Sequence, residues 1–327
     1  MQEKKVTVVI PNYNGIKYIK PCMDALRAQR EEGQSFDILV VDNGSEDGSL
    51  EVLQQYSEAK VLSLPENTGF CHAVNLGICE SKTPYVILLN NDTVVKSGFV
   101  RYLLDAIEQS DRIFSVSAQM LSMQDEQLID DAGDRYCVLG WAYARGKGKR
   151  ASGYEKPVRI FAACGGASIY RRDLILGELG GFDENHFAYM EDVDIGYRAN
   201  IYGYQNLYEP RAKVIHAGSA ASGSRYNEFK TRLASANNAY LIGKNMPLLQ
   251  IVLNLPFLLL GFLIKALFFA RKRMGHLYIS GYCQGIAKCF SPDGRRHKVK
   301  FRWHHLGNYL QIQLFLYIDT VRYIFKR

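Results

Sequence analysis

Short apolar runs that end in polar turn residues constrain the fold of this chain most. The runs at 6–10, 37–41 and 85–89 are rich in β-branched and other apolar residues, the pattern of strands buried on both faces. Apolar residues at helical spacing over 19–30 separate the first two runs. Strand, helix, strand in this order predicts an α/β fold with a mostly parallel central sheet flanked by helices.

Polar residues gather where these predicted strands end, and ligands of such sheets bind beyond the carboxyl ends of the strands. Asp42 is suited to accept the N3–H of a pyrimidine ring. In the alternative interpretation, Asp42, Asn43 and Asp92 form turns and cap helices. Neither a GxGxxG nor a P-loop motif accompanies them. The predicted cofactor-binding residues are Pro11, Asn12, Tyr13, Asp42, Asn43, Asn67, Gly69, Asn75, Asn90, Asn91 and Asp92.

The stretch FAYMEDVDIGYR, residues 187–198, predicts a catalytic helix start. Glu191, Asp192 and Asp194 lie where exposed N–H groups and the helix dipole keep carboxylates ionised, and an ionised carboxylate in a cleft accepts protons. The alternative is an ordinary helix start, with Arg198 as a surface partner of these acids.

Asp92 at the mouth of a buried strand favours a hard divalent cation, Mg²⁺ or Mn²⁺, because such ions take oxygen ligands. The segment 130–156, rich in Gly, Lys and Arg and containing Trp141, is predicted to be a mobile substrate loop. Gly165 and Gly166 allow close backbone approach, or alternatively serve packing alone.

The basic charge is concentrated at the end of the chain. Residues 244–327 hold fourteen Lys or Arg against two Asp, a net of +12, so the total of +7 leaves 7 − 12 = −5 for residues 1–243. We predict a mildly acidic catalytic domain over 1–243 and a basic, helical, membrane-associating region over 244–327 that meets an anionic leaflet. No nucleic-acid-binding fold accompanies the basic residues.

The uncharged run at 246–264 could span a membrane, lie in its interface as one helix, or form a hairpin broken at Pro256. A buried helix pair within a soluble protein is the remaining alternative. The start of the chain lacks the pattern of a signal peptide, and the odd number of cysteines, seven, argues against a disulfide framework. We therefore expect the protein at the cytoplasmic face of a membrane, and the family resemblance described next implies a bacterial cell membrane.

Seven motifs in order over residues 6–223 resemble the family 2 inverting glycosyltransferases of the GT-A type, in the bacterial rhamnosyltransferase-like branch. They are VVIPNYNG, VVDNGSEDGS, ENTGFCHAVN, LLNNDT, the Gly-Gly pair before Arg-Arg, GGFDENHFAYMEDVDIGYR and VIHAGS. The resemblance implies a nucleotide-sugar donor, Asp192 as catalytic base with Glu191 beside it, and Asp92 and His216 as metal ligands. Asn90 departs from the family's DxD motif, which weakens two-carboxylate chelation. Acceptor contacts are expected from Trp141, Gly165, Gly166 and Asp194.

These expectations combine into an inverting transfer of a sugar, L-rhamnose from dTDP-L-rhamnose, to a lipid-linked or polysaccharide acceptor in cell-surface glycan synthesis. The alternatives are a UDP-hexose donor, a sugar-phosphate nucleotidyltransferase, and a non-catalytic membrane-anchored carbohydrate-binding protein. The sequence leaves homo-oligomer formation open.

Overall fold

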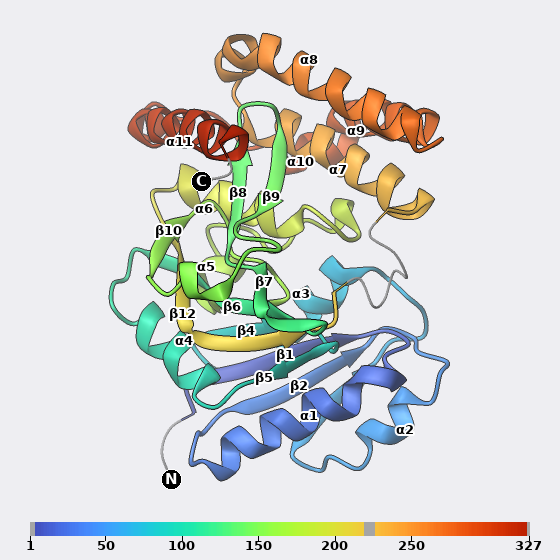
Figure 1. Cartoon of the computed structure of the whole chain (residues 1–327), viewed down its shortest axis with the longest axis vertical. Helices are drawn as coiled ribbons and strands as arrows, with labels where there is room; N and C mark the ends of the chain where they lie inside the picture. Colours follow the sequence, from blue (N-terminus) through green and yellow to red (C-terminus); the bar gives the residue numbers. More distant parts are fainter. Residues whose placement is uncertain (1–3, 219–225, 326–327) are drawn as a thin grey trace.

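One mixed sheet of ten strands organises the first two thirds of the chain in the computed structural model, which describes residues 4–218 and 226–325 (Figure 1). The strand order is β10-β12-β6-β11-β4-β1-β2-β3, with β5 beside β12 and β7 beside β6, and β8 and β9 form a separate hairpin. The strands are β1 Val6–Asn12, β2 Asp37–Asp42, β3 Ala59–Ser63, β4 Tyr85–Leu89, β5 Thr93–Val95, β6 Ile113–Ser122, β7 Asp125–Asp131, β8 Asp134–Cys137, β9 Trp141–Ala144, β10 Val158–Ile160, β11 Ala167–Arg171 and β12 Gln205–His216.

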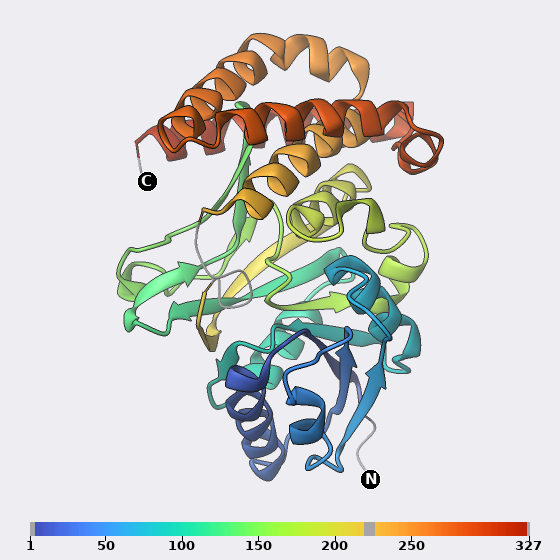
Figure 2. The ribbon, with the colours of Figure 1, turned by 90° about the vertical axis from the view of Figure 1, so that its right-hand side faces the viewer.

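Helices cover both faces of this sheet and form a further layer beyond it (Figures 1 and 2). The α-helices are α1 Ile16–Glu31, α2 Ser49–Leu53, α3 Phe70–Glu80, α4 Phe99–Ile107, α5 Arg172–Leu176, α6 Glu191–Ile201, α7 Glu228–Asn245, α8 Leu248–Arg271, α9 Gly275–Phe290, α10 Pro292–His297 and α11 Leu306–Ile324. Short 3₁₀ turns lie at Ala151–Gly153, Glu184–His186 and Trp303–His305.

The alternation of side chains along β1 explains how the two faces are covered. Val8 packs into the core that holds Ile19 and Met23 of α1, and Val9 packs into the opposite core with Val74 of α3. All five side chains are essentially inaccessible to water. Each such apolar side chain contributes roughly 1.5–3 kcal/mol by burial, which fixes the register of the strand against both helix layers.

The α/β class predicted from the apolar runs is confirmed, but the sheet is mixed rather than mostly parallel. Strands β4, β1, β2 and β3 are mutually parallel, whereas β11 runs antiparallel between β4 and β6. The parallel part places Asn12 opposite Asp42 in register and brings the carboxyl ends of β1, β2 and β4 to one edge. Gly203, just after α6, has the left-handed backbone that commonly follows the end of a helix, with φ of 87°.

The boundary predicted between 243 and 244 falls inside α7. Lys244 is buried in that helix and forms ion pairs with Asp183 and Asp194 of the preceding region. The β8–β9 hairpin extends away from the sheet and reaches α8 and α11 (Figure 1). The last helices are therefore fastened to the catalytic part of the chain at two places.

One further expectation is wrong, because part of the segment 130–156, predicted as a mobile loop, forms the paired strands β8 and β9. Of the alternatives for the run at 246–264, a hairpin broken at Pro256 does not occur, since α8 runs through that residue without interruption.

Candidate active site

Asp92 and His216 meet at the edge of the sheet, as the sequence predicts. Asp92 follows β4, His216 is the last residue of β12, and Asp92 Oδ1 lies 3.3 Å from His216 Nε2. Two ligands at right angles around one Mg²⁺ or Mn²⁺ lie about 3 Å apart. The spacing and the oxygen and nitrogen donors therefore fit a single divalent ion.

Asp130 of β7 lies behind His216 and was not predicted as a site residue. Its Oδ2 is 2.8 Å from His216 Nδ1, and its Oδ1 is 2.6 Å from Nζ of Lys147. A carboxylate that accepts the Nδ1–H of a histidine fixes the tautomer whose Nε2 lone pair faces outward. Asp130 is thus placed to orient His216 toward the position of the ion. A signal was present in the sequence, since three aspartates fall within residues 130–134.

Burial and hydrogen bonding shift the pKa values of His216 and Asp130 in opposite directions. Burial by itself would lower the pKa of His216, but the hydrogen bonds to Asp130 and Asp92 outweigh it and raise the pKa to about 9. Burial would raise the pKa of Asp130, whereas its hydrogen bonds to His216 and Lys147 lower it to about 2. The two aspartates and His216 therefore form a charged cluster in which a metal ion competes with a proton for Nε2.

Gly165 and Gly166 connect this cluster to the start of α6. The Gly166 carbonyl accepts a hydrogen bond from the N–H of Asn90, and the Gly165 N–H lies 3.4 Å from Asp192 Oδ2. A Cβ at Gly166 would lie 3.0 Å from the Asn90 side-chain nitrogen. These glycines allow the segment that carries Asp92 and the helix that carries Asp192 to approach each other, while the predicted contact with an acceptor stays a prediction.

Asp192 has the surroundings of a proton acceptor. Its side chain is half-buried at the N-terminus of α6, and Oδ1 accepts the Val193 N–H at 2.7 Å. No arginine or lysine within the described residues forms an ion pair with it. Burial raises the pKa of Asp192 above the ordinary 3.8, although backbone N–H groups partly oppose the shift. A carboxylate without a cation partner keeps its affinity for a proton, as a general base requires.

Glu191 is buried beside it, and its Oε2 has no hydrogen-bond partner. Burial and the charge of Asp192 raise the pKa of Glu191 well above 4.5. Asp131, Asp134 and Cys164 form a neighbouring cluster that sequence analysis missed. Burial, chiefly, raises the pKa of Asp131 to about 7 and that of Asp134 well above 3.8. Asp192 thus lies beside acids whose proton affinity is raised by burial.

Asp194 does not contact an acceptor, contrary to the prediction, because it is fully buried. Arg198 donates to its Oδ2 at 2.7 and 3.1 Å, Lys244 Nζ lies 2.8 Å from the same oxygen, and Asn245 donates to Oδ1 at 2.7 Å. Burial would raise the pKa of Asp194, but Arg198 and Lys244 hold it well below 3.8. Asp194 is therefore a structural ion that fastens α6 to α7. Arg198 is likewise buried rather than a surface partner.

The predicted donor-side residues of the first two strands form one hydrogen-bonded chain. Asn91 Nδ2 donates to Asn12 Oδ1 at 2.7 Å, and Asn12 Nδ2 donates to Asp42 Oδ1 at 2.7 Å. Asp42 is almost fully buried and also accepts the Ser45 N–H at 3.1 Å. This arrangement includes the turn expected in the alternative interpretation, and base recognition by Asp42 stays a prediction. Tyr13, two residues after Pro11, is 42% exposed and therefore accessible to a ligand.

Asn43, Asn67 and Gly69 build the turn before α3. Asn43 accepts from both the N–H and the hydroxyl of Thr68 at 2.9 Å and donates to Asn67 Oδ1 at 3.1 Å. Gly69 has φ of 92°, and a Cβ there would collide with the ring and carbonyl of Phe187. The turn is thereby held against the segment that leads into α6.

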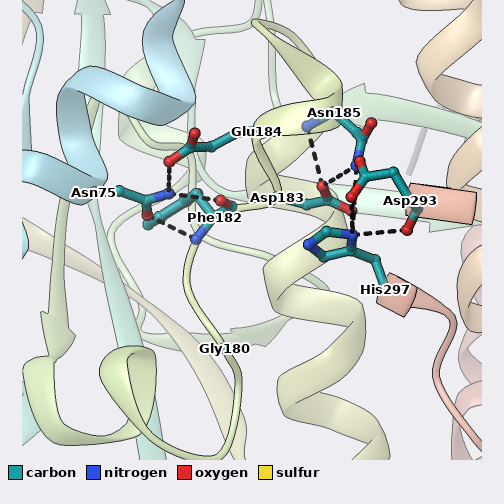
Figure 3. Close-up of a pocket in the computed structure, with 8 residues that line it drawn as sticks. All are labelled: Asn75, Gly180, Phe182, Asp183, Glu184, Asn185, Asp293 and His297. Atoms are coloured by element: carbon teal, nitrogen blue, oxygen red, sulfur yellow. Dashed lines mark hydrogen bonds and ion pairs between the residues drawn. The ribbon is translucent and has the colours of Figure 1, made fainter. Parts of the chain in front are cut away.

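Asn75 lies elsewhere, in a small polar pocket between α3, the segment 180–185 and α10 (Figure 3). Its side chain donates to the Phe182 carbonyl at 2.8 Å and to Glu184 at 3.0 Å, and it accepts the Phe182 N–H at 2.9 Å. These bonds account for the donor and acceptor groups of the amide. The structure thus gives Asn75 the role of holding the 182–184 segment, and its predicted contact with a donor has no support in this arrangement.

Trp141 also lies away from Asp192, contrary to its predicted place in an acceptor loop. It is 7% exposed, its Nε1–H donates to the Gly261 carbonyl of α8 at 3.2 Å, and its ring meets Tyr323 edge-on. Lys265 lies 5.4 Å above the ring. Trp141 therefore joins the hairpin to the last helices, and an acceptor contact at this buried ring is not supported.

The sequence of this chain is similar to those of known glycosyltransferases and of a polymerase. The glycosyl transferase family 2 sequence model matches residues 7–176, just over half of the chain. An N-acetylglucosaminyl-diphospho-decaprenol L-rhamnosyltransferase of Mycobacterium tuberculosis is 29% identical over 212 residues, covering 57% of this chain and 68% of the relative. A teichoic acid poly(glycerol phosphate) polymerase of Staphylococcus epidermidis is 26% identical over 246 residues, covering 74% of this chain and 31% of the relative.

Solved structures confirm the predicted GT-A fold. The crystal structure of GalNAc-T7 with UDP, GalNAc and Mn²⁺ has a TM-score of 0.60 at 17% identity, over 74% of this chain and 48% of that one. A mannosyltransferase from Pyrobaculum calidifontis with GDP-Man and Mn²⁺ has a TM-score of 0.55 at 14% identity, over 100% of this chain and 89% of that one.

Proposed function

Since the chain belongs to glycosyl transferase family 2 and is a glycosyltransferase, we propose that it transfers a sugar from a nucleotide donor to an acceptor with inversion, using Asp192 as the general base. The observation that carries this proposal is the position of Asp192, for which the described residues supply no cation partner, across the Gly165–Gly166 pair from Asp92 and His216.

In the proposed reaction the acceptor hydroxyl attacks the anomeric carbon on the face opposite the nucleoside diphosphate. The new C–O bond forms as the old one breaks, its electron pair leaves with the diphosphate, and the hydroxyl proton passes to Asp192. Attack from the opposite face inverts the anomeric centre. Burial and the charge of Asp192 raise the pKa of Glu191, which favours the protonated form that would donate a hydrogen bond beside the base.

Asp92 and His216 would hold a divalent cation, and Asp130 would keep His216 oriented toward it. The ion would supply positive charge for the leaving diphosphate. Mn²⁺ in two solved structures with this fold supports a divalent ion here as well. Asn90, in place of an acid, leaves Asp92 as the one carboxylate of the 90–92 segment.

For the donor we propose a dTDP- or UDP-sugar, with dTDP-L-rhamnose first, supported by the mycobacterial rhamnosyltransferase among the relatives. We propose a lipid-linked or polysaccharide acceptor of the cell envelope, supported by one relative named for a diphospho-decaprenol-linked N-acetylglucosamine and another named for teichoic acid. Family membership argues against a nucleotidyltransferase and a non-catalytic carbohydrate-binding protein.

We further propose that α8 lies on the cytoplasmic membrane surface rather than across the membrane. By length and composition α8 is able to cross a membrane. However, its buried stripe of Gln250, Asn254, Leu258 and Gly261 packs on the protein, and Gln250 and Asn254 both donate to Gln313 of α11 at 3.0 Å. The opposite face exposes leucines to solvent, including Leu249 at 80% and Leu253 at 54%. A helix anchored on its polar side and apolar on its outer side suits an interface.

Replacement of Asp192 tests the central assignment. With purified protein and dTDP-L-rhamnose, Asp192→Asn should lower kcat about 10²–10⁴-fold, the usual contribution of a general base. Donor binding should change little, because the base contacts the acceptor. Transfer by this variant at near the original rate would show that Asp192 is not the base.

A further inference from the structure

A long groove lies between the β8–β9 hairpin, the segment that follows it, and helices α8 and α11, with a volume of about 1630 Å³. We call it the hairpin groove and infer that it holds the prenyl diphosphate part of a lipid-linked acceptor. This inference rests on the proposed function, since it names the substrate class that would reach Asp192.

One wall of the hairpin groove is apolar and continues onto the outer face of α8. Phe257, Leu260 and Ile264 line it, and they are 40%, 50% and 43% exposed. They belong to the helix whose outer leucines we place against the membrane. An apolar chain that leaves the bilayer could therefore enter the groove without crossing a polar barrier.

The groove also carries three cations for which the described residues supply no counter-ion. Arg145 lies 4.6 Å from the ring of Tyr154, Arg159 lies 4.7 Å from the ring of Phe315, and Lys265 lies over Trp141. None of these three cations forms an ion pair with a carboxylate of residues 4–218 or 226–325. All three line the groove.

Arg159 also has a buried Nε without a hydrogen-bond partner in the same described part of the chain. Half-buried cations without an anion are unfavourable, so an anionic group in the groove would be stabilised there. A groove lined by both apolar side chains and these cations fits a ligand with both an apolar chain and a phosphate or diphosphate. A free polysaccharide offers neither group.

The groove also leads toward the catalytic site. Lys147 lines it, and the Lys147 ammonium lies 2.6 Å from Asp130, which in turn contacts His216. A diphosphate held by Arg145 and Arg159 would leave the attached sugar free to extend past Lys147 toward Asp192. The hairpin groove would thus bind the lipid, and the catalytic site would bind only the sugars.

Trp141 provides a binding assay that does not depend on transfer. The chain has two tryptophans, Trp141 in the groove and the 79% exposed Trp303, so Trp303→Phe leaves Trp141 as the single reporter. In this background farnesyl diphosphate should change the fluorescence saturably. Farnesol and inorganic pyrophosphate, which each lack one half of the ligand, should bind at least about tenfold more weakly.

Arg145→Gln and Arg159→Gln should each weaken farnesyl diphosphate binding by about tenfold or more, the loss expected for one hydrogen bond to a charged group. Arg101→Gln is a matched control, because Arg101 also stacks on a tyrosine, Tyr102 at 4.8 Å, but lies on α4. It should bind like the parent. Thermal unfolding of each variant identifies any that misfolds, and the remaining arginine variant then decides.

Three results would overturn the inference: no saturable signal with farnesyl diphosphate, equal binding by both arginine variants and the parent, or equally tight binding of short-chain phosphatidylglycerol. The last result would make the groove a general site for membrane lipids. Transfer to a water-soluble acceptor separates this inference from the proposed function. If transfer occurs while farnesyl diphosphate does not bind, only the groove assignment fails; if farnesyl diphosphate binds and no acceptor is glycosylated, the proposed function fails.

Discussion

Lys244→Met should destabilise the protein far more than the loss of an ordinary ion pair. The Lys244 side chain is 2% exposed, and its Nζ lies 2.7 Å from Asp183 and 2.8 Å from Asp194, which are themselves 1% and 0% exposed. Methionine keeps most of the apolar stem and removes the charge. Removing one partner of a buried ion pair costs about 3–5 kcal/mol, because the remaining charge is left without compensation.

The pKa of Asp183 gives a second measure of this interaction. Burial would raise the pKa, but Lys244 lowers it to about 2 from 3.8, a difference worth roughly 2.4 kcal/mol. A lowered pKa stabilises the fold above pH 3.8, and this contribution is lost as the pH falls toward 2. In Lys244→Met the pKa of Asp183 should rise. The deficit of the variant relative to the parent should therefore be largest at neutral pH and shrink as the solution is acidified toward pH 4.

Urea unfolding measures the effect. With a slope of about 3 kcal/mol per M, the midpoint of Lys244→Met should fall by roughly 1–1.5 M. Lys60→Met is the control, because Lys60 pairs with Glu80 at 2.7 Å but both side chains are exposed, and such pairs contribute about 0–1 kcal/mol. Adding Asp183→Asn to Lys244→Met should recover part of the loss. Equal midpoints for the two lysine variants would refute the reasoning.

Three further predictions concern the metal, the base and the membrane. Asp130→Asn should lower the pKa of His216 from about 9. The parent should therefore release nearly one proton when it binds Mn²⁺ at pH 8, and the variant should release less, as measured by calorimetry in two buffers. Equal proton release would contradict the Asp130 contact. Since burial raises the pKa of Asp192, kcat should fall as the pH drops through a value above 3.8, and a profile that stays flat down to pH 4 would count against this assignment. Leu249→Glu with Leu253→Glu should reduce co-sedimentation with anionic vesicles by at least about tenfold, since each leucine loses roughly 1.5–3 kcal/mol of burial; Leu176→Glu on α5, also exposed, is the control and should sediment like the parent.

Sequence analysis predicted the position of an element correctly where the pattern of neighbouring residues determines the structure. The run at 85–89 is entirely apolar and forms β4 with the same bounds, because a strand that is buried on both faces needs apolar side chains at every position. Asp92 and His216 were brought together through the family resemblance, and Asp192 lies at a helix start as its local pattern indicates. For β4 and for Asp192 the nearest residues in sequence decide the structure, whereas the pairing of Asp92 with His216 was not visible in any local pattern.

The errors share a different physical cause, which is contact between distant parts of the chain. Trp141 looks like a loop residue from its neighbours, but its partners Gly261 and Tyr323 lie 120 or more positions away. Asp194 looks like a solvent-facing acid at a helix start until Lys244 covers it. Asp130 becomes part of the site only when β7 pairs with β6 beside β12. None of these contacts leaves a periodic pattern in the sequence.

The β8–β9 hairpin links these corrections into one argument about function. It was expected to be mobile, yet Val138 N–H donates to α11, Trp141 donates to α8, and Tyr143 OH donates to the Asp319 carbonyl at 2.7 Å. The strand before it, β7, carries Asp130. The chain from β7 to β9 therefore connects Asp130, which contacts His216, with the hydrogen bonds that join the hairpin to α8 and α11.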